Sequence, residues 1–364
     1  MRTRSFIILL ILIPLLLLAG AAVYFLGPWG QKGTDGSNQI ANKIQLLVSE
    51  AVVSPILSFD GEKIWYMTQG GRLFRIPLPQ SLPPGEGKDS DGSPPSRGGD
   101  EGRVETEEYL LPEPVQNPVK IIWPQTGNDF IVERSAQPAA YYDSASQKFT
   151  DYSPQLKTPR FLVDPNKIIY DWQRADGGHE LKISDKNGEN FHKIADLRRP
   201  DYEIVASPSR EEVVLFGRDN LEPSYLILVN LGTGEFRDID GKNLYSGAKF
   251  SPDGTKLAVF RGEGEGLMVY DLDSFTLSPD GLPADEAGRG EGEGEFAWTA
   301  DGQGLVFASK LGFFKYELAA SQQSEIYKFK EGEDYKPREL ILYPTKNLLI
   351  FLDGKTGYLY KLEY

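Results

Sequence analysis

The chain of 364 residues contains no cysteine and only two histidines, His179 and His192. Without cysteine it has no disulfide, no thiolate metal site, no cysteine nucleophile and no acylated cysteine behind a signal sequence. Two histidines give little material for a zinc site or a Ser-His-Asp triad, and both lie near expected turns, so we place them on the surface. The composition therefore predicts no catalytic residue, no metal ligand and no cofactor.

Basic residues are also scarce, with 39 lysines and arginines against 53 aspartates and glutamates and a net charge of −14. A nucleic-acid partner is disfavoured because neutralising phosphates requires clustered cations. The same excess of acid argues against broad polybasic contact with a membrane. Long amphipathic helices are missing after the N-terminal region, whereas 38 glycines and 25 prolines suit many short strands joined by turns.

One long apolar run is present at the N-terminus. Phe6–Leu26 carries no charge, and about 20 apolar residues cross the hydrocarbon layer of a bilayer. Arg2 and Arg4 precede the run, so the positive-inside rule places residues 1–5 in the cytoplasm. We expect a single-pass anchor at 6–26, a flexible tether at 27–42 and an extracytoplasmic domain after it. The alternative is cleavage near Ala19-Gly20-Ala21, which would make the protein secreted.

A short sequence motif recurs throughout residues 43–364. Its clearest copy, residues 248–260 (AKFSPDGTKLAVF), reads as a strand, a Pro-Asp-Gly hairpin and a second strand. The second strands of the seven copies end at Tyr66, Val132, Tyr170, Phe216, Phe260, Phe307 and Phe351. Most copies lie roughly 40–50 residues apart, which is typical of propeller blades. The first interval is longer because it contains Pro79–Glu105, rich in Pro, Gly, Ser and charge, which we interpret as a disordered insertion.

The repeat predicts an all-β fold, a seven-bladed β-propeller of four-stranded blades over residues 43–364, preceded by one N-terminal transmembrane helix. Six or eight blades are the alternatives. The last repeat lacks an outer strand, and Ile44–Val48 has no other place in the pattern. We therefore expect Ile44–Val48 to pair antiparallel with Tyr358–Leu362 and close the ring, because an open ring would expose sheet edges.

The motif aromatic-Ser-Pro-Asp-Gly, followed by apolar strands, resembles the WD-like repeat of TolB-type propellers. The resemblance is carried by Phe250–Asp271 and, less fully, by Phe59–Ile76 and Trp298–Leu318. It concerns the repeat and not the TolB protein itself. Propeller peptidases with similar repeats add a hydrolase domain with a Gly-x-Ser-x-Gly motif, which this sequence does not contain, so the resemblance implies no peptidase activity.

Carboxylates in the repeats are interpreted as turn residues. Asp60, Asp253 and Asp301 each precede glycine at the same hairpin, where Asp-Gly supplies turn geometry. The segment Asp185–Asn190 faintly resembles a calcium loop, but it lacks the full ligand spacing and is better explained as a hairpin turn.

A basic residue follows the second strand in five repeats, and these five are the only candidates for partner binding. They are Arg134, Arg174, Arg218, Arg261 and Lys310. We expect them on one face of the propeller, with acidic turns on the other. They serve either a structural or solubilising role, or form a partial ring that recruits an acidic partner.

Two functions remain open. The first is a membrane-tethered extracytoplasmic module, monomeric in its ectodomain, that binds or scaffolds a protein or a cell-envelope polymer. The second is a propeller enzyme, lactonase- or lyase-like, with a divalent cation held by carboxylates in the central channel. We favour the binding module, and three or more acidic or amide side chains converging in the channel would favour the enzyme.

Overall fold

The fold is taken from a computed structural model, which describes residues 44–58, 61–78, 106–200, 202–217, 223–261, 266–277, 295–343 and 347–364. The anchor Phe6–Leu26, the tether 27–42 and the insertion Pro79–Glu105 lie outside these residues, and the expectations for them stay predictions. Within the described ranges, no helix has the length and apolar character needed to cross a membrane.

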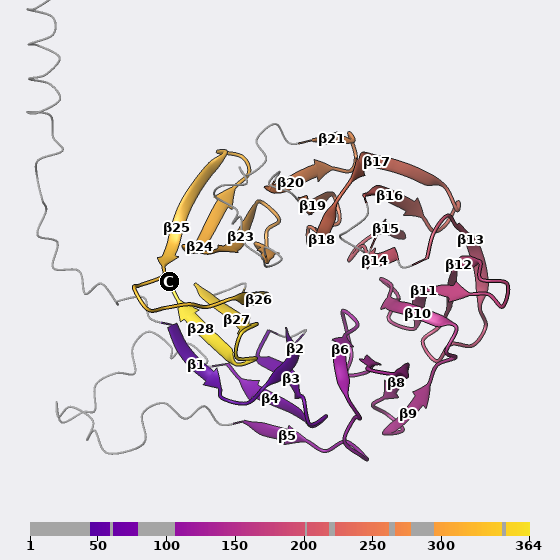
Figure 1. The fold of residues 1–364 in the computed structure, drawn as a ribbon, viewed down its shortest axis with the longest axis horizontal. Helices are drawn as coiled ribbons and strands as arrows, with labels where there is room; N and C mark the ends of the chain where they lie inside the picture. The colour runs from indigo at the N-terminus through magenta and orange to yellow at the C-terminus, as the bar shows by residue number, and fades with distance from the viewer. Residues whose placement is uncertain are drawn as a thin grey trace, which may run out of the picture. The chain divides into compact units, whose positions relative to one another are not determined.

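The described residues form seven four-stranded antiparallel sheets arranged as blades around a ring (Figure 1). The predicted seven-bladed, all-β propeller is therefore confirmed. In blades 1 to 6 the four strands follow one another along the chain, and the first strand lies nearest the centre (Figure 1). First strands of neighbouring blades contact one another, as β2 does with both β6 and β26.

The strands are grouped by blade in chain order. Blade 1 comprises β2 (Val52–Leu57), β3 (Lys63–Thr68), β4 (Leu73–Pro77) and β5 (Glu107–Tyr109), and blade 2 comprises β6 (Pro118–Ile122), β7 (Phe130–Arg134), β8 (Gln137–Asp143) and β9 (Lys148–Asp151). Blade 3 comprises β10 (Leu156–Phe161), β11 (Lys167–Gln173), β12 (His179–Asp185) and β13 (His192–Leu197), and blade 4 comprises β14 (Tyr202–Ala206), β15 (Glu212–Gly217), β16 (Ser224–Asn230) and β17 (Phe236–Asn243). Blade 5 comprises β18 (Tyr245–Phe250), β19 (Lys256–Arg261), β20 (Gly266–Asp271) and β21 (Thr276–Leu277), and blade 6 comprises β22 (Phe296–Trp298), β23 (Gly304–Ser309), β24 (Gly312–Glu317) and β25 (Gln322–Lys328). Blade 7 comprises β26 (Pro337–Tyr343), β27 (Leu348–Asp353), β28 (Leu359–Glu363) and the N-terminal strand β1 (Ile44–Val48).

The hydrophobic core is divided among the seams between blades. Each pair of neighbouring blades shares one cluster of buried apolar side chains, and the pair formed by blades 7 and 1 has its own. At the seam between blades 5 and 6, for example, Phe260 packs with Phe296 at a centroid distance of 5.5 Å. Burying one such side chain contributes about 1.5–3 kcal/mol, so the ring is held together blade by blade.

The Asp-Gly hairpins at Asp253 and Asp301 have the predicted turn geometry, whereas Asp60 lies outside the described residues. Gly254 has φ 70°, and a Cβ there would lie 2.3 Å from the Ser209 Oγ atom, so only glycine fits without a shift. The Asp253 carboxylate accepts hydrogen bonds from the hydroxyls of Ser251 and Thr255, at 2.6 and 2.9 Å. These bonds outweigh the opposing effect of burial and lower the pKa of Asp253 to about 2. Asp253 is thus a turn residue, as interpreted.

The segment after β12 is likewise a hairpin. It joins β12 to β13, has Gly188 at φ 87°, and is closed by a hydrogen bond of 2.6 Å from the Asn190 amide to the Asp185 carboxylate. The turn interpretation of this segment is confirmed.

The ring is closed by strands from the two ends of the propeller. β1 pairs antiparallel with β28, and Ile44 faces Leu362 while Leu46 faces Tyr360. Ile44 and Val48 are 8% and 6% exposed, because they pack into the seams on either side of blade 7. The predicted closure is confirmed, with β28 shifted by one residue from the expected range.

Candidate functional site

The described basic candidates occupy equivalent places in their blades. Arg134 ends β7, Arg174 follows β11, Arg261 ends β19 and Lys310 follows β23, so each lies at the hairpin between the second and third strands. Antiparallel strands bring these hairpins to one face of the ring, which we call the middle-hairpin face. Arg218 lies outside the described residues.

The three arginines are paired within the propeller. Arg134 donates hydrogen bonds to the Pro138 carbonyl at 2.6 and 2.9 Å and to Asp151 at 2.7 Å. Arg174 pairs with Asp176 at 3.1 Å and is 3.5 Å from Glu180. Arg134 and Arg174 are therefore neutralised by acids of their own blades. Lys310 is exposed to solvent.

Arg261 joins two blades. Its guanidinium pairs with Asp240 on β17 of blade 4 and donates to the Tyr270 hydroxyl at 2.6 Å. Burial alone would raise the pKa of Asp240, but hydrogen bonds from Tyr270 and Tyr245 and the charge of Arg261 lower it. The same burial raises the pKa of Tyr245, which also donates to Asp240. These contacts give Arg261 a structural role between blades 4 and 5.

Charged side chains meet across the central channel on one side of the ring. The Lys120 Nζ atom on β6 lies 3.6 Å from Glu203 on β14, and these strands belong to blades 2 and 4. Arg160, on β10 of the intervening blade 3, donates to Glu133 at 2.9 Å and to Glu203 at 2.5 Å. The Arg160 side chain is only 10% exposed. Burial opposes its charge, but Glu203 and Glu133 raise the pKa of Arg160.

A similar pair lies on the other side of the channel. The Lys249 Nζ atom on β18 is 3.1 Å from the Glu295 carboxylate and donates to the Phe296 carbonyl at 2.6 Å. Blades 5 and 6 are thereby joined. Lys120, Arg160 and Lys249 are in this way matched by the carboxylates of Glu133, Glu203 and Glu295.

Glu339, on β26 of blade 7, is a fourth carboxylate in this group. Within the described ranges, no group hydrogen-bonds or ion-pairs with its carboxylate. Burial is the main cause that raises its pKa to about 7, followed by the negative charge of Glu295, while Lys120 and Lys249 act in the opposite direction. Glu339 lies on β26, the innermost strand of blade 7 (Figure 1), and the other three side chains come from blades 6, 2 and 5. We call Lys120, Arg160, Lys249, Glu133, Glu203, Glu295 and Glu339 the channel cluster.

Backbone bulges interrupt three of the first strands. Ser54 in β2, Thr158 in β10 and Glu339 in β26 have φ of 45°, 47° and 51°, and the strand register shifts at each. A non-glycine residue in this conformation costs about 1–2 kcal/mol, and bulges of this kind recur next to functional sites. The Ser54 hydroxyl accepts a hydrogen bond of 3.0 Å from the Ile121 backbone, which ties blade 1 to blade 2.

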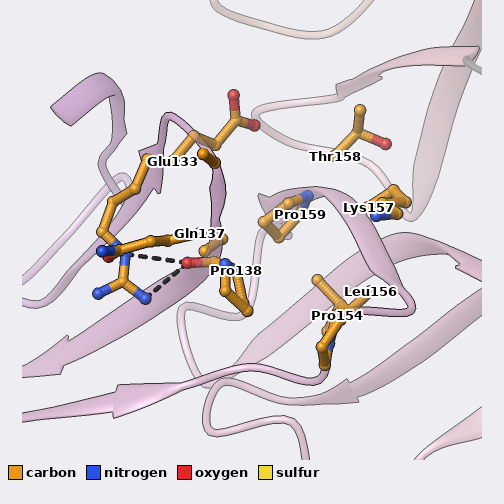
Figure 2. A pocket seen from close by; sticks show the side chains of 11 residues that line it. Glu133, Gln137, Pro138, Pro154, Leu156, Lys157, Thr158 and Pro159 are labelled. Atoms are coloured by element: carbon orange, nitrogen blue, oxygen red, sulfur yellow. Dashed lines mark hydrogen bonds between the residues drawn. The ribbon is translucent and has the colours of Figure 1, made fainter. Parts of the chain in front are cut away.

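A pocket of about 440 Å³ opens between blades 2 and 3 beside this cluster. Figure 2 shows Glu133 and Gln137 on one side of it, Lys157 and Thr158 on the other, and prolines between them. Arg134 also lines the pocket and donates two hydrogen bonds to the Pro138 carbonyl. Since Glu133 belongs both to the pocket and to the pair with Arg160, pocket and cluster are continuous.

A second pocket, of about 430 Å³, lies between blades 1 and 2 near the first-to-second hairpins. Trp65 and Trp123 line it with ring centroids 6.1 Å apart, and Arg75 lies 5.8 Å over the Trp65 ring. A positive charge already covers one of the two indoles, so this pocket does not suit a cationic ligand.

The expectation of two surface histidines is half wrong. His192 is exposed, but the His179 side chain is only 10% exposed and its Nδ1 atom lies 2.8 Å from the Asp171 carboxylate. A buried carboxylate requires a polar partner, and the neighbouring strand supplies one through His179. Over the described ranges, no group of three or more His, Cys, Asp or Glu side chains could hold a metal ion.

Neither a family model nor a curated protein matches this sequence. Solved structures do resemble the fold. An oligogalacturonate lyase in complex with manganese aligns with a TM-score of 0.60 and 10% identity over 88% of this chain and 93% of its own. An oligogalacturonate lyase from Vibrio parahaemolyticus gives 0.59 and 11% identity over 90% and 94%. The β-propeller domain of Myceliophteria thermophila Cps50 (Swd1) gives 0.58 and 11% identity over 89% and 99%.

At these identities the likeness establishes the fold class, a seven-bladed propeller with WD-like repeats, and nothing finer. The same architecture carries a lyase in one case and a WD-type propeller domain in the other. The resemblance to TolB-type repeats stays a prediction.

Proposed function

We propose that this protein is a membrane-tethered, extracytoplasmic binding or scaffolding module, which docks a protein or a cell-envelope polymer on its middle-hairpin face. The observation that carries the proposal is the continuity of the pocket between blades 2 and 3 with the channel cluster. Ion pairs between blades hold this surface in one conformation, and such a preformed surface lowers the entropic cost of binding. The apolar segment Phe6–Leu26 supports the tether.

Capture from envelope extract tests this proposal. The full chain in detergent micelles is compared with a variant that reverses two exposed charges of the middle-hairpin face, Arg174→Glu with Lys310→Glu. Lys148→Glu is the control, because Lys148 is exposed at a third-to-fourth hairpin on the opposite face. A change in the amount of captured material with the double variant alone, in either direction, supports docking on this face. Equal capture by all three contradicts it.

An enzyme is the second candidate, because the channel cluster holds four glutamates and so meets the condition that the sequence set for it. Three of the four are ion-paired with Lys120, Arg160 or Lys249, and Glu339 is therefore the residue that favours this candidate. A carboxyl group with a pKa of about 7 beside a second carboxylate, Glu295, suits general acid–base catalysis near neutral pH. The two lyases of similar fold, one of them bound to manganese, make a channel reaction worth testing. Calorimetric titration with Mn²⁺ decides between the candidates: binding by the full chain and its loss in Glu339→Gln favour the enzyme, whereas absence of binding disfavours it.

A further inference from the structure

The pocket between blades 1 and 2 differs in charge from the chain as a whole. The protein carries a net charge of −14, yet none of the eleven residues that line this pocket is an aspartate or a glutamate. Two of the lining residues, Lys63 and Arg75, are basic. Arg75 is paired with Glu107 on β5, whereas the Lys63 side chain has no ion pair or hydrogen bond with another described residue. The pocket therefore presents one cation that an anion from outside would match.

One part of the pocket wall is aromatic and is held in place by further rings. Trp65 and Trp123 are half-buried, and their ring centroids lie 6.1 Å apart at an interplanar angle of 42°. Tyr109 packs against Trp65 at a centroid distance of 5.4 Å. Phe130 packs against Trp123 at 5.2 Å. Trp65 also faces Arg75 across β3 and β4, so the aromatic wall is preformed, which lowers the entropic cost of binding.

Polar side chains from the first-to-second hairpins of both blades complete the lining. Gln125 and Asn128 are exposed, and their amides make no hydrogen bond within the described ranges. With Lys63 they supply several free donors and two free acceptors beside the aromatic wall. The hairpin that carries Lys63 is fixed by a hydrogen bond of 2.9 Å from the Lys63 backbone to the Ser58 hydroxyl.

A sugar ring that carries a carboxylate has the chemistry that these groups require. The C–H bonds on one face of a pyranose are weakly positive and stack on the negative face of an indole, while its hydroxyls exchange hydrogen bonds with amides. Its carboxylate pairs with an ammonium group. A purely apolar ligand would leave Lys63 and both amides without partners, and a cation would meet the Arg75 charge that lies 5.8 Å over the Trp65 ring.

We propose that this pocket binds an acidic sugar residue, stacked on the wall formed by Trp65 and Trp123, with its carboxylate on the Lys63 ammonium. The inference goes beyond the proposed docking, because the first-to-second hairpins lie on the face opposite to the middle-hairpin face. An acidic polysaccharide held there leaves the middle hairpins accessible to a second partner.

Tetramers of glucuronic acid and of glucose, joined by the same linkage, are the probes. Each is titrated calorimetrically into the full chain at physiological ionic strength, in micelles of a detergent that contains no sugar. We expect the glucuronic acid tetramer to bind about fivefold more tightly than the glucose tetramer. The difference should disappear at about 1 M salt, where the pairing with Lys63 is screened.

Two variants test the two parts of the pocket, each with a matched control. Lys63→Met should weaken the glucuronic acid tetramer to the level of the glucose tetramer and leave the glucose tetramer unchanged. Lys148→Met is its control, because Lys148 is an exposed lysine on the same face but outside the pocket. Trp123→Phe keeps a ring in the seam but reduces the stacking surface, so both tetramers should bind several-fold more weakly. Trp172→Phe is its control, because Trp172 is half-buried in blade 3, away from the pocket.

A melting curve of each variant separates loss of folding from loss of binding. The proposal is overturned if neither tetramer binds wild type, or if Lys63→Met or Trp123→Phe leaves binding unchanged. Equal affinity of wild type for the two tetramers also overturns it, since the carboxylate would then contribute nothing. Capture of envelope material through the middle-hairpin face is measured separately, so either proposal can fail while the other stands.

Discussion

Replacing Glu339 by glutamine should change how the stability of the propeller depends on pH. In the folded state the pKa of Glu339 is raised from 4.5 to about 7 by burial and by Glu295. The folded protein therefore holds this proton more tightly than the unfolded chain does. As pH rises from about 4.5 to about 7, the free energy of unfolding falls by as much as about 3 kcal/mol, since each pKa unit corresponds to about 1.4 kcal/mol.

Glutamine has the shape of glutamate and cannot ionise. Glu339→Gln should therefore match wild type near pH 4.5 and exceed its stability near pH 8 by up to about 3 kcal/mol, or a rise in melting temperature on the order of 5 °C. Circular dichroism melting of the full chain at both pH values provides the measurement, with Glu331→Gln as the control. If the curves of wild type and Glu339→Gln run parallel with pH, Glu339 is not a desolvated, unpaired carboxylate and the reasoning is refuted.

Three further results are expected from the contacts within the propeller. Aspartate in place of Ile44 or Val48, both buried in the closing strand β1, should lower the free energy of unfolding by several kcal/mol in denaturation experiments. Leu46→Asp is the control, because Leu46 lies on the same strand with 47% of its surface exposed, and it should cost much less. Equal effects would contradict closure of the ring by β1. Arg261→Ala leaves the Asp240 carboxylate and the Tyr270 hydroxyl without their cation and should cost about 3–5 kcal/mol, and a melt within error of wild type would refute its structural role. Arg174→Ala removes a side chain that is 40% exposed and should leave the melting temperature close to that of wild type, so a clear drop would show that its ion pairs are stronger than surface pairs usually are.

The blade repeat could be predicted because its signals are local. Asp-Gly hairpins and alternating apolar strands lie within a few residues of each other, as in 248–260, and each produces a hairpin without help from distant sequence. The closure by Ile44–Val48 could also be predicted, since the last repeat lacked a strand and an edge had to be covered.

The channel cluster could not be predicted in this way. Lys120 and Glu203 lie far apart along the chain, and they meet only because the ring brings blades 2 and 4 together. The pairing of the arginines was hidden for a similar reason. The partners of Arg134 and Arg261 are Asp151 and Asp240, on outer strands that contain no buried residue and carry no apolar alternation. His179 was misplaced because its buried partner Asp171 lies on the neighbouring strand.

The central claim is that a partner docks on the middle-hairpin face at the channel. Site-specific photo-crosslinking in native membranes tests it most directly, with a crosslinking residue in place of Val119 or Leu277 in the full chain. Val119, next to Lys120 in β6, is 59% exposed, and Leu277, on the outer strand β21, is 41% exposed. We predict a discrete protein adduct from position 119 and none from position 277. Adducts from position 277 alone, or equal adducts from both positions, would contradict the account.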